Sequence, residues 1–261
     1  MEMKYKTAVI GGTMTALGAA LALKDDYIII EKGAVPGFEF AHAFKAGKNW
    51  DMTPVAERGA SLKAELEKRN ILENGRVSIA AIPPVIFNMI KNEKLNFLFW
   101  TEIPEITKKG KYWEIKLFNA SGLNTILAEN ILDTASGGVF GKFASSLKMK
   151  KINAVLNGTG EFTVSENAEI VDCRFPSEKI FSVSLDMSAD WPSARKKLFN
   201  TFIYGHQRNK EWRIAATAFT FDYSSEKGPF IADEKWTYLP STGYDNPLAA
   251  FDAGYTFEWE K

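Results

Sequence analysis

The sequence has few of the residues that form disulfides or bind metal ions in small proteins. It contains a single cysteine, Cys173, among 261 residues. One cysteine cannot form an internal disulfide, and the two histidines, His42 and His206, lie far apart in the chain. No Cys/His cluster has the spacing that zinc requires. We therefore expect no metal site, and this cysteine usage fits a reducing, cytoplasmic setting.

Excess charge and long apolar runs are also missing. Lys plus Arg and Asp plus Glu number 32 each, so the formal net charge is +0. This balance argues against a general attraction to nucleic acid or to anionic membranes. The longest apolar stretch, residues 14–23, is too short to span a bilayer. The start of the chain has no cleavable signal layout. We expect a small-molecule partner, with no nucleic acid and no membrane.

The first 31 residues carry the strongest positive signal. Residues 7–10 form a short apolar run, and Gly11-Gly12-Thr13 follows as a turn. Residues 14–23 are rich in Ala and Leu, which favour helix, and residues 27–30 form a second apolar run ending at Glu31. This order predicts a βαβ unit with a right-handed crossover, and hence a parallel sheet.

This geometry suits a dinucleotide. The start of a helix has unpaired N–H groups and partial positive charge, which accept a pyrophosphate. Glycines in the turn let the backbone approach that anion, and an acidic residue after the second strand accepts hydrogen bonds from ribose hydroxyls. Glu31 lies 20 positions after Gly11, the expected separation. Its carboxylate would repel a 2′-phosphate, which disfavours an NADP-type ligand.

The glycine fingerprint is incomplete. Gly11 stands at the first position of G-x-G-x-x-G, whereas Thr13 stands at the second and Ala16 at the third. Alanine at the third position still allows close packing of helix and strand. Thr13 has two interpretations: its hydroxyl donates to a phosphate, or its side chain weakens the site. A βαβ unit without any nucleotide is the third alternative.

Residues 5–37, from Tyr-Lys-Thr-Ala-Val-Ile-Gly-Gly-Thr-Met-Thr-Ala-Leu-Gly to Ile-Glu-Lys-Gly-Ala-Val-Pro-Gly, resemble the beginning of FAD-dependent oxidoreductases with a glutathione-reductase-like FAD domain. In that family the first turn holds the pyrophosphate and the acidic residue holds the adenosine ribose. The resemblance therefore implies FAD as the cofactor. The positions that would contact it in this segment are Gly11, Gly12, Thr13, Met14, Glu31 and Lys32.

Two later segments are similar to the same family. Residues 102–107, 111–119 and 124–128 are alternating runs separated by turns at Gly110 and Gly122, and they predict a β-meander. Residues 130–137 then resemble the family's strand followed by small residues. The resemblance implies that Glu102 and Ile103 lie near the adenine. It also implies that Thr134, Ala135 and Ser136 lie near the phosphate and ribose.

Near the end of the chain, residues 236–239 predict a strand and residues 248–253 a helix stopped by Gly254. Asn246 before Pro247 is a good helix start. In the family, a late helix points its first turn at the flavin pyrimidine ring, which implies this role for Asn246, Pro247 and Leu248. An ordinary capped helix without a ligand is the alternative.

The sequence thus predicts an α/β fold in which residues 1–142 and 231–261 form a Rossmann-like FAD-binding domain with a parallel sheet and a β-meander. Residues 143–230 are predicted to form a small α+β substrate or cap region.

Between the segments that resemble the FAD domain, a helix is expected over residues 52–68, starting at Thr53-Pro54, and a strand over 213–223. The aromatic stripe Phe219, Phe221 and Tyr223 is interpreted as core rather than ligand cradle. The aromatic-rich segment 38–44 could line a flavin pocket, and its His42 is either a proton donor or a packed side chain. His206, Arg208 and Arg213 are either an anion site or a surface cluster.

Three hypotheses of function follow. The first is an FAD-dependent oxidoreductase that passes a hydride between a small molecule and the flavin, whose chemistry the protein tunes. The second is an FAD-fold protein that binds a nucleotide without turnover, and the third is a structural protein with an emptied pocket. No residue is identified as the catalytic acid or base.

Overall fold

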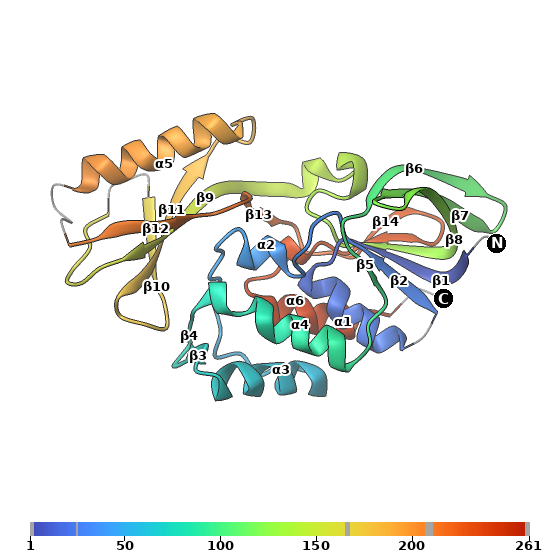
Figure 1. The fold of residues 1–261 in the computed structure, drawn as a ribbon, viewed down its shortest axis with the longest axis horizontal. Helices are drawn as coiled ribbons and strands as arrows, with labels where there is room; N and C mark the ends of the chain where they lie inside the picture. The colour runs from blue at the N-terminus through green and yellow to red at the C-terminus, as the bar shows by residue number, and fades with distance from the viewer. Residues whose placement is uncertain (1–2, 25, 165–167, 207–210, 259–261) are drawn as a thin grey trace.

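A computed structural model describes residues 3–24, 26–164, 168–206 and 211–258. Of residues 205 and 206 only the backbone is described. Figure 1 shows two sheets at opposite ends of the molecule, with helices α1, α4 and α6 between them. The long strand β9 (Leu147–Asn157) runs from the first end toward the second.

The first sheet has the order β14-β15-β8-β1-β2-β5. Its parallel strands are β1 (Met3–Ile10), β2 (Tyr27–Ile30), β5 (Phe97–Leu98), β8 (Gly122–Asp133) and β15 (Trp236–Tyr238). Strand β14 (Phe230–Asp233) adds an antiparallel edge. Every residue of β2 and the last four of β1 are buried, as expected of strands covered on both faces. The predicted parallel sheet is confirmed.

Two different layers cover this sheet. On one face, α1 (Met14–Leu23) packs against Val9, Ile29 and Leu132, and α6 (Pro247–Tyr255) packs on α1. On the other face, Trp113, Ile115 and Trp236 form a separate core between the sheet and the meander. The meander consists of β6 (Glu102–Lys109), β7 (Tyr112–Asn119) and β8. This is the Rossmann-like α/β arrangement with a β-meander that the sequence predicts.

The last predicted run of the meander and the strand predicted after it are one element. Residues 124–128 and 130–133 belong to the single 12-residue strand β8, which pairs with β7 on one side and with β1 on the other. In the structure Asn130 stays within the strand, and its Nδ2 donates to the Lys6 carbonyl at 3.0 Å.

Helix α3 (Glu57–Lys68) starts later than the predicted Thr53-Pro54. The carboxylate of Asp252 on α6 accepts hydrogen bonds from the amides of Val55 and Ala56, so it holds the preceding segment outside the helix. Helix α4 (Pro83–Asn92) packs beside η1 (Ile79–Ala81), and the short hairpin β3 (Leu72–Glu73) and β4 (Arg76–Val77) follows α3.

Gly254 does not stop the last helix, which continues to Tyr255. A Cβ atom on Gly254 would lie 1.9 Å from the Thr15 carbonyl oxygen, and one on Gly18 would lie 1.9 Å from the Phe251 carbonyl oxygen. These two glycines let the backbones of α1 and α6 touch. The prediction of a stop was wrong because this glycine serves a helix crossing rather than a helix end.

The second sheet contains β9, β10 (Ala168–Asp172), β11 (Glu178–Leu185), β12 (Arg213–Thr217) and β13 (Asp222–Ser225), covered by α5 (Trp191–His206). The strand expected over 213–223 is two strands that pair with different parts of β9. The chain leaves the sheet between them because the Phe219 amide donates to the His42 carbonyl. These strands lie inside the predicted 143–230 region, whose exact boundaries stay a prediction. No helix within the described ranges has both the length and the apolar character needed to cross a membrane.

Candidate ligand-binding cleft

A cleft of about 410 Å³ opens at the carboxyl ends of β1, β2 and β8. In open α/β sheets this edge is where ligands bind. The strands of the first sheet and the loops next to them contribute Ile10, Gly11, Ile30, Glu31, Lys32, Thr101, Glu102, Ile103, Ala135, Ser136, Gly138, Val139 and Phe140 to its lining. Helix α2 (Phe38–Ala41) contributes Phe38 and Glu39, the segment before β13 contributes Thr220 and Phe221, and β13 contributes Tyr223.

Six of the predicted cofactor-binding residues line this cleft: Gly11, Glu31, Lys32, Ile103, Ala135 and Ser136. Glu102 lies there too. Gly12, Thr13, Met14 and Thr134 are buried directly beside it, in the turn between β1 and α1 and at the end of β8. Segments separated by about a hundred residues of sequence therefore meet at one edge of the sheet, as the βαβ interpretation requires.

Thr13 leaves the cleft open. It is the N-cap of α1: its Oγ1 accepts from the Ala16 amide at 3.2 Å and donates to Thr134 Oγ1 at 2.7 Å. Its side chain is fully buried, so it points into the protein. Gly11 supplies the turn with φ of +89°, a conformation that favours glycine. The threonine hydroxyl therefore serves the helix start, and its methyl group does not fill the cleft.

Glu31 is a buried carboxylate facing the cleft. It accepts hydrogen bonds from the amides of Gly12 and Gly33, each at 2.6 Å. Burial raises the pKa of Glu31, while these two amides and the Lys32 charge oppose that rise. An ionised carboxylate offers about four acceptor positions. Two positions remain for the hydroxyls of a ligand.

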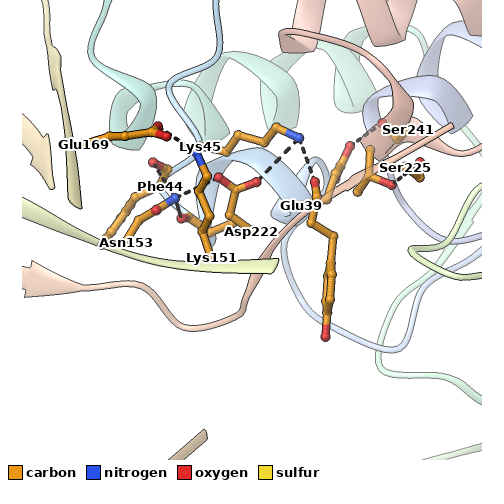
Figure 2. A network of polar contacts seen from close by, with 12 residues as sticks. Glu39, Phe44, Lys45, Lys151, Asn153, Glu169, Asp222, Ser225 and Ser241 are labelled. Atoms are coloured by element: carbon orange, nitrogen blue, oxygen red, sulfur yellow. Dashed lines mark hydrogen bonds and ion pairs between the residues drawn. The ribbon is translucent and has the colours of Figure 1, made fainter. Parts of the chain in front are cut away.

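Glu39 is the acidic residue of the site that sequence reasoning missed. Its Oε1 accepts from the Met14 amide at 2.9 Å and from Ser241 Oγ at 2.6 Å, as Figure 2 shows for Ser241. Its Oε2 is buried and has no hydrogen-bond partner in the described part of the chain. The one available signal was a glutamate between two phenylalanines, Phe38 and Phe40, in an otherwise apolar segment.

The pKa of Glu39 is raised to about 7, chiefly by burial and also by the Glu31 charge, against the hydrogen bonds from Ser241, Met14 and its own amide. This group occupies the start of α1, where the helix dipole favours negative charge. The Thr15 amide also has a side-chain partner, Ser241 Oγ at 3.4 Å. The position that binds phosphate in nucleotide-binding helices therefore holds a carboxyl group of the protein itself.

Asp133 was also missed. It ends β8, and its carboxylate accepts from the amides of Ala135 and Val139 at 3.1 and 2.6 Å. Burial raises the pKa of Asp133 to about 7, against these hydrogen bonds and the Lys142 charge. Asp133 thereby shapes the loop that carries Ala135 and Ser136 along the cleft.

The end of the cleft near the second sheet is aromatic, with Phe38, Phe140, Phe221 and Tyr223. The interpretation of the stripe as core holds in part for Phe221, which is partly buried against the core of the second sheet and also lines the cleft. Tyr223, within β13, lines the cleft. The interpretation is wrong for Phe219. Phe219 is 74% exposed and faces the His42 ring at 5.3 Å.

The histidine and arginine candidates do not join this cleft. His42 is half-buried, burial lowers its pKa, and it is not among the lining residues. Arg213 is exposed at the start of β12. Arg208 and the side chain of His206 lie outside the described residues. Among the residues that are described, no three His, Cys, Asp or Glu side chains gather as a metal ion would require.

Asn246, Pro247 and Leu248 are buried away from the cleft. The Asn246 side chain accepts from the Ala249 amide, and it donates to the carbonyls of Lys48 and Asn49. Gly47 packs on the same turn, where a Cβ atom would lie 2.4 Å from the Asp245 carbonyl oxygen. The start of α6 is therefore capped and covered by residues 47–49, which favours the ordinary capped helix.

The buried acids predict a stability that falls with pH. The pKa of Glu39 is about 7 in the folded protein and 4.5 in its reference state, so the folded state holds an extra proton between these values. Its stabilisation is complete below the lower value and is lost as pH rises through about 7. We expect a loss of about 3 kcal/mol from this group between pH 4.5 and 8.

Urea unfolding at pH 5 and at pH 8 measures this loss. Glu39→Gln keeps an oxygen for Met14 and Ser241 but has no titration, so its free energy of unfolding should change less between the two pH values. If the free energy of unfolding changed by the same amount between pH 5 and pH 8 in wild type and in the variant, the raised pKa of Glu39 would be contradicted.

No protein-family model matches the sequence, and no curated protein sequence matches it. Solved structures do match. The p-nitrophenol 4-monooxygenase PnpA from Pseudomonas putida DLL-E4 has a TM-score of 0.63 at 12% identity, over 98% of this chain and 77% of that one. Aklavinone-11 hydroxylase, solved with FAD and aklavinone, has a TM-score of 0.66 at 9% identity, over 98% of this chain and 61% of that one. The flavin-dependent brominase Bmp2 has a TM-score of 0.66 at 11% identity, over 96% and 78%.

These structures define the class of the fold. The chain has the FAD-binding fold of flavin-dependent monooxygenases and halogenases. It spans 61% of the hydroxylase and 77% of the monooxygenase. At such identities the likeness concerns the fold, and the ligand must be argued from the cleft itself.

The cleft residues fit FAD when one condition is met. The Gly11 turn and the free acceptor positions of Glu31 suit an adenosine ribose, and the aromatic end suits a flat apolar ring. The orphaned Oε2 of Glu39 is the one buried side-chain atom at the diphosphate position without a partner among the described residues. A diphosphate at this position would require a neutral Glu39, because only the protonated carboxyl group can donate a hydrogen bond to it.

Proposed function

We propose that this chain is a flavoprotein of the oxidoreductase class that binds FAD along the cleft, with the adenosine at Glu31 and the flavin toward the aromatic end. The observation that carries the proposal is the Glu31 carboxylate, buried at the carboxyl end of β2 and facing the cleft beside the start of α1. When bound, the flavin would supply the hydride chemistry with a small-molecule substrate.

The chain's own groups would bind and orient that cofactor. Glu31 accepts hydrogen bonds from the two ribose hydroxyls, and its charge disfavours a ligand with a 2′-phosphate. Phe38, Phe221 and Tyr223 surround the far end and exclude water from it. The predicted contacts of Ile103 with the adenine and of Ala135 and Ser136 with the ribose and phosphate belong to the same proposal.

Titration of the purified protein with FAD tests this proposal through quenching of the flavin fluorescence. We expect saturable binding of FAD, together with a retained yellow colour after gel filtration at pH 6. FMN lacks the adenosine that Glu31 recognises, so it should bind at least tenfold more weakly. Failure to bind FAD at any pH between 6 and 8, or equal binding of FMN, would refute the proposal.

The second candidate is a protein that binds the nucleotide without turnover. It is favoured by the start of α6, the turn that was expected to face the flavin, because residues 47–49 pack against that turn. Reduction of the bound flavin by NADH or NADPH and its reoxidation by oxygen distinguish the two. Rates above those of free FAD support the oxidoreductase, and rates equal to those of free FAD support the binding protein.

A further inference from the structure

We propose that Glu39 binds the diphosphate of a dinucleotide as a neutral hydrogen-bond donor, so that the ligand and one proton enter the cleft together. This inference rests on the proposed function and names the residue that sets its ligand preference. It follows from the position of the Glu39 carboxyl group. Its Oε1 accepts two hydrogen bonds, whereas its Oε2 accepts none from the described residues.

The two oxygens of Glu39 have different surroundings. Oε1 accepts both hydrogen bonds, from the Met14 amide and from Ser241 Oγ. Oε2 is buried and finds no partner among the residues described, in a side chain that is only 2% exposed and that lines the cleft. A buried polar atom without a partner costs about 1–3 kcal/mol. The arrangement indicates that a ligand atom completes the hydrogen bonding of Oε2.

The protonation state decides which ligand atom that is. Ionised, Oε2 is an acceptor and repels a diphosphate oxygen. Neutral, Oε2–H donates, while Oε1 remains the acceptor for Met14 and Ser241. The α1 dipole favours the ionised form while no anion is bound, and a bound diphosphate reverses that preference because it brings its own negative charge. Anion binding therefore requires uptake of one proton when Glu39 starts ionised.

The charged groups around Glu39 support this coupling. From β2, Glu31 raises the pKa of Glu39, and Lys32 beside it is exposed. From the segment after α2, Lys45 lies 3.5 Å from Asp222 Oδ1 of β13 and donates to the Tyr223 carbonyl at 2.7 Å, as Figure 2 shows for the Lys45–Asp222 pair.

The other described contacts of Glu39, with α1 and with the turn at Ser241, involve no positively charged side chain. Helix α1 presents amides, and the turn at Ser241 presents a hydroxyl. Glu102 contributes a further acidic group to the lining of the cleft. No ion pair with Glu39 occurs among the described residues, and burial together with the Glu31 charge raises its pKa.

Isothermal titration of FAD at pH 8 in buffers of different ionisation enthalpy tests the inference. We expect uptake of about one proton per FAD, and a Kd that rises about tenfold per pH unit above pH 7. In Glu39→Gln the side-chain amide donates at every pH, so the uptake should vanish and the Kd should be about tenfold lower than that of wild type at pH 8.

Glu178→Gln is the matched control, because Glu178 is also a half-buried carboxylate that accepts from a serine, Ser78 Oγ at 3.1 Å, away from the cleft. It should keep the proton uptake and the pH-dependent Kd of wild type.

A wild-type Kd that is constant from pH 6 to 9, with no proton uptake, would overturn the inference while leaving FAD binding established. Absence of FAD binding in wild type and in Glu39→Gln at pH 6 would overturn the proposed function, and the inference with it. Circular dichroism of both variants confirms that the comparison is made between folded proteins.

Discussion

Replacing Gly18 by alanine is expected to lower the free energy of unfolding by about 3 kcal/mol or more. The new methyl group would lie 1.9 Å from the Phe251 carbonyl oxygen, an atom of the α6 backbone that cannot rotate away. Overpacking of this kind typically costs about 1–3 kcal/mol and more when backbone must move. Helix propensity alone predicts the opposite sign, a gain of about 1 kcal/mol.

Urea unfolding followed by circular dichroism measures this change. Gly110→Ala is the matched control, because the β6–β7 turn leaves open space around its Cβ and has φ of +62°. It should cost only the 1–2 kcal/mol or so of a left-handed alanine. A Gly18→Ala protein as stable as wild type would refute the close crossing of α1 and α6.

That crossing also positions the cleft. Thr15 Oγ1 donates to the Ala250 carbonyl at 3.1 Å, which fixes the start of α1 against α6. Ser241 then lies close enough to bond both Thr15 and Glu39. Gly18→Ala protein that still folds should therefore bind FAD more weakly, although Gly18 lies outside the cleft.

Glu31→Arg is expected to weaken FAD binding by at least 100-fold. The change removes the acceptor of two ribose hydrogen bonds, and each bond to a charged group contributes about 1.5–3 kcal/mol. At 1.4 kcal/mol per tenfold, two such bonds exceed a factor of 100. The arginine also leaves the buried Gly12 amide without its carboxylate partner.

Fluorescence titration with FAD measures the loss, and Glu31→Gln provides the graded comparison. Glutamine keeps one acceptor oxygen, so its affinity should fall between wild type and arginine. Lys32→Gln, a change in the adjacent exposed side chain, should lower affinity far less. Equal affinity in wild type and Glu31→Arg would remove the ribose role of this carboxylate.

The sequence by itself determined the elements whose signal is local. The apolar runs of β1 and β2, the glycine turn and the alternating strands of the meander each depend on neighbours within a few residues. Strand pairing at the carboxyl ends then brings Gly11, Glu31 and Ala135 to one edge, because parallel strands align those ends.

Only the tertiary structure decided the contacts between elements distant in sequence. Glu39 meets Ser241, 202 positions away, and Asp252 meets Val55, 197 positions away. Gly254 was predicted to stop a helix and instead lies where two helices cross, and Glu39, to which no role was assigned, is buried at the start of α1. Such roles depend on which surfaces pack together, and a contact of this separation leaves no periodic pattern in the chain.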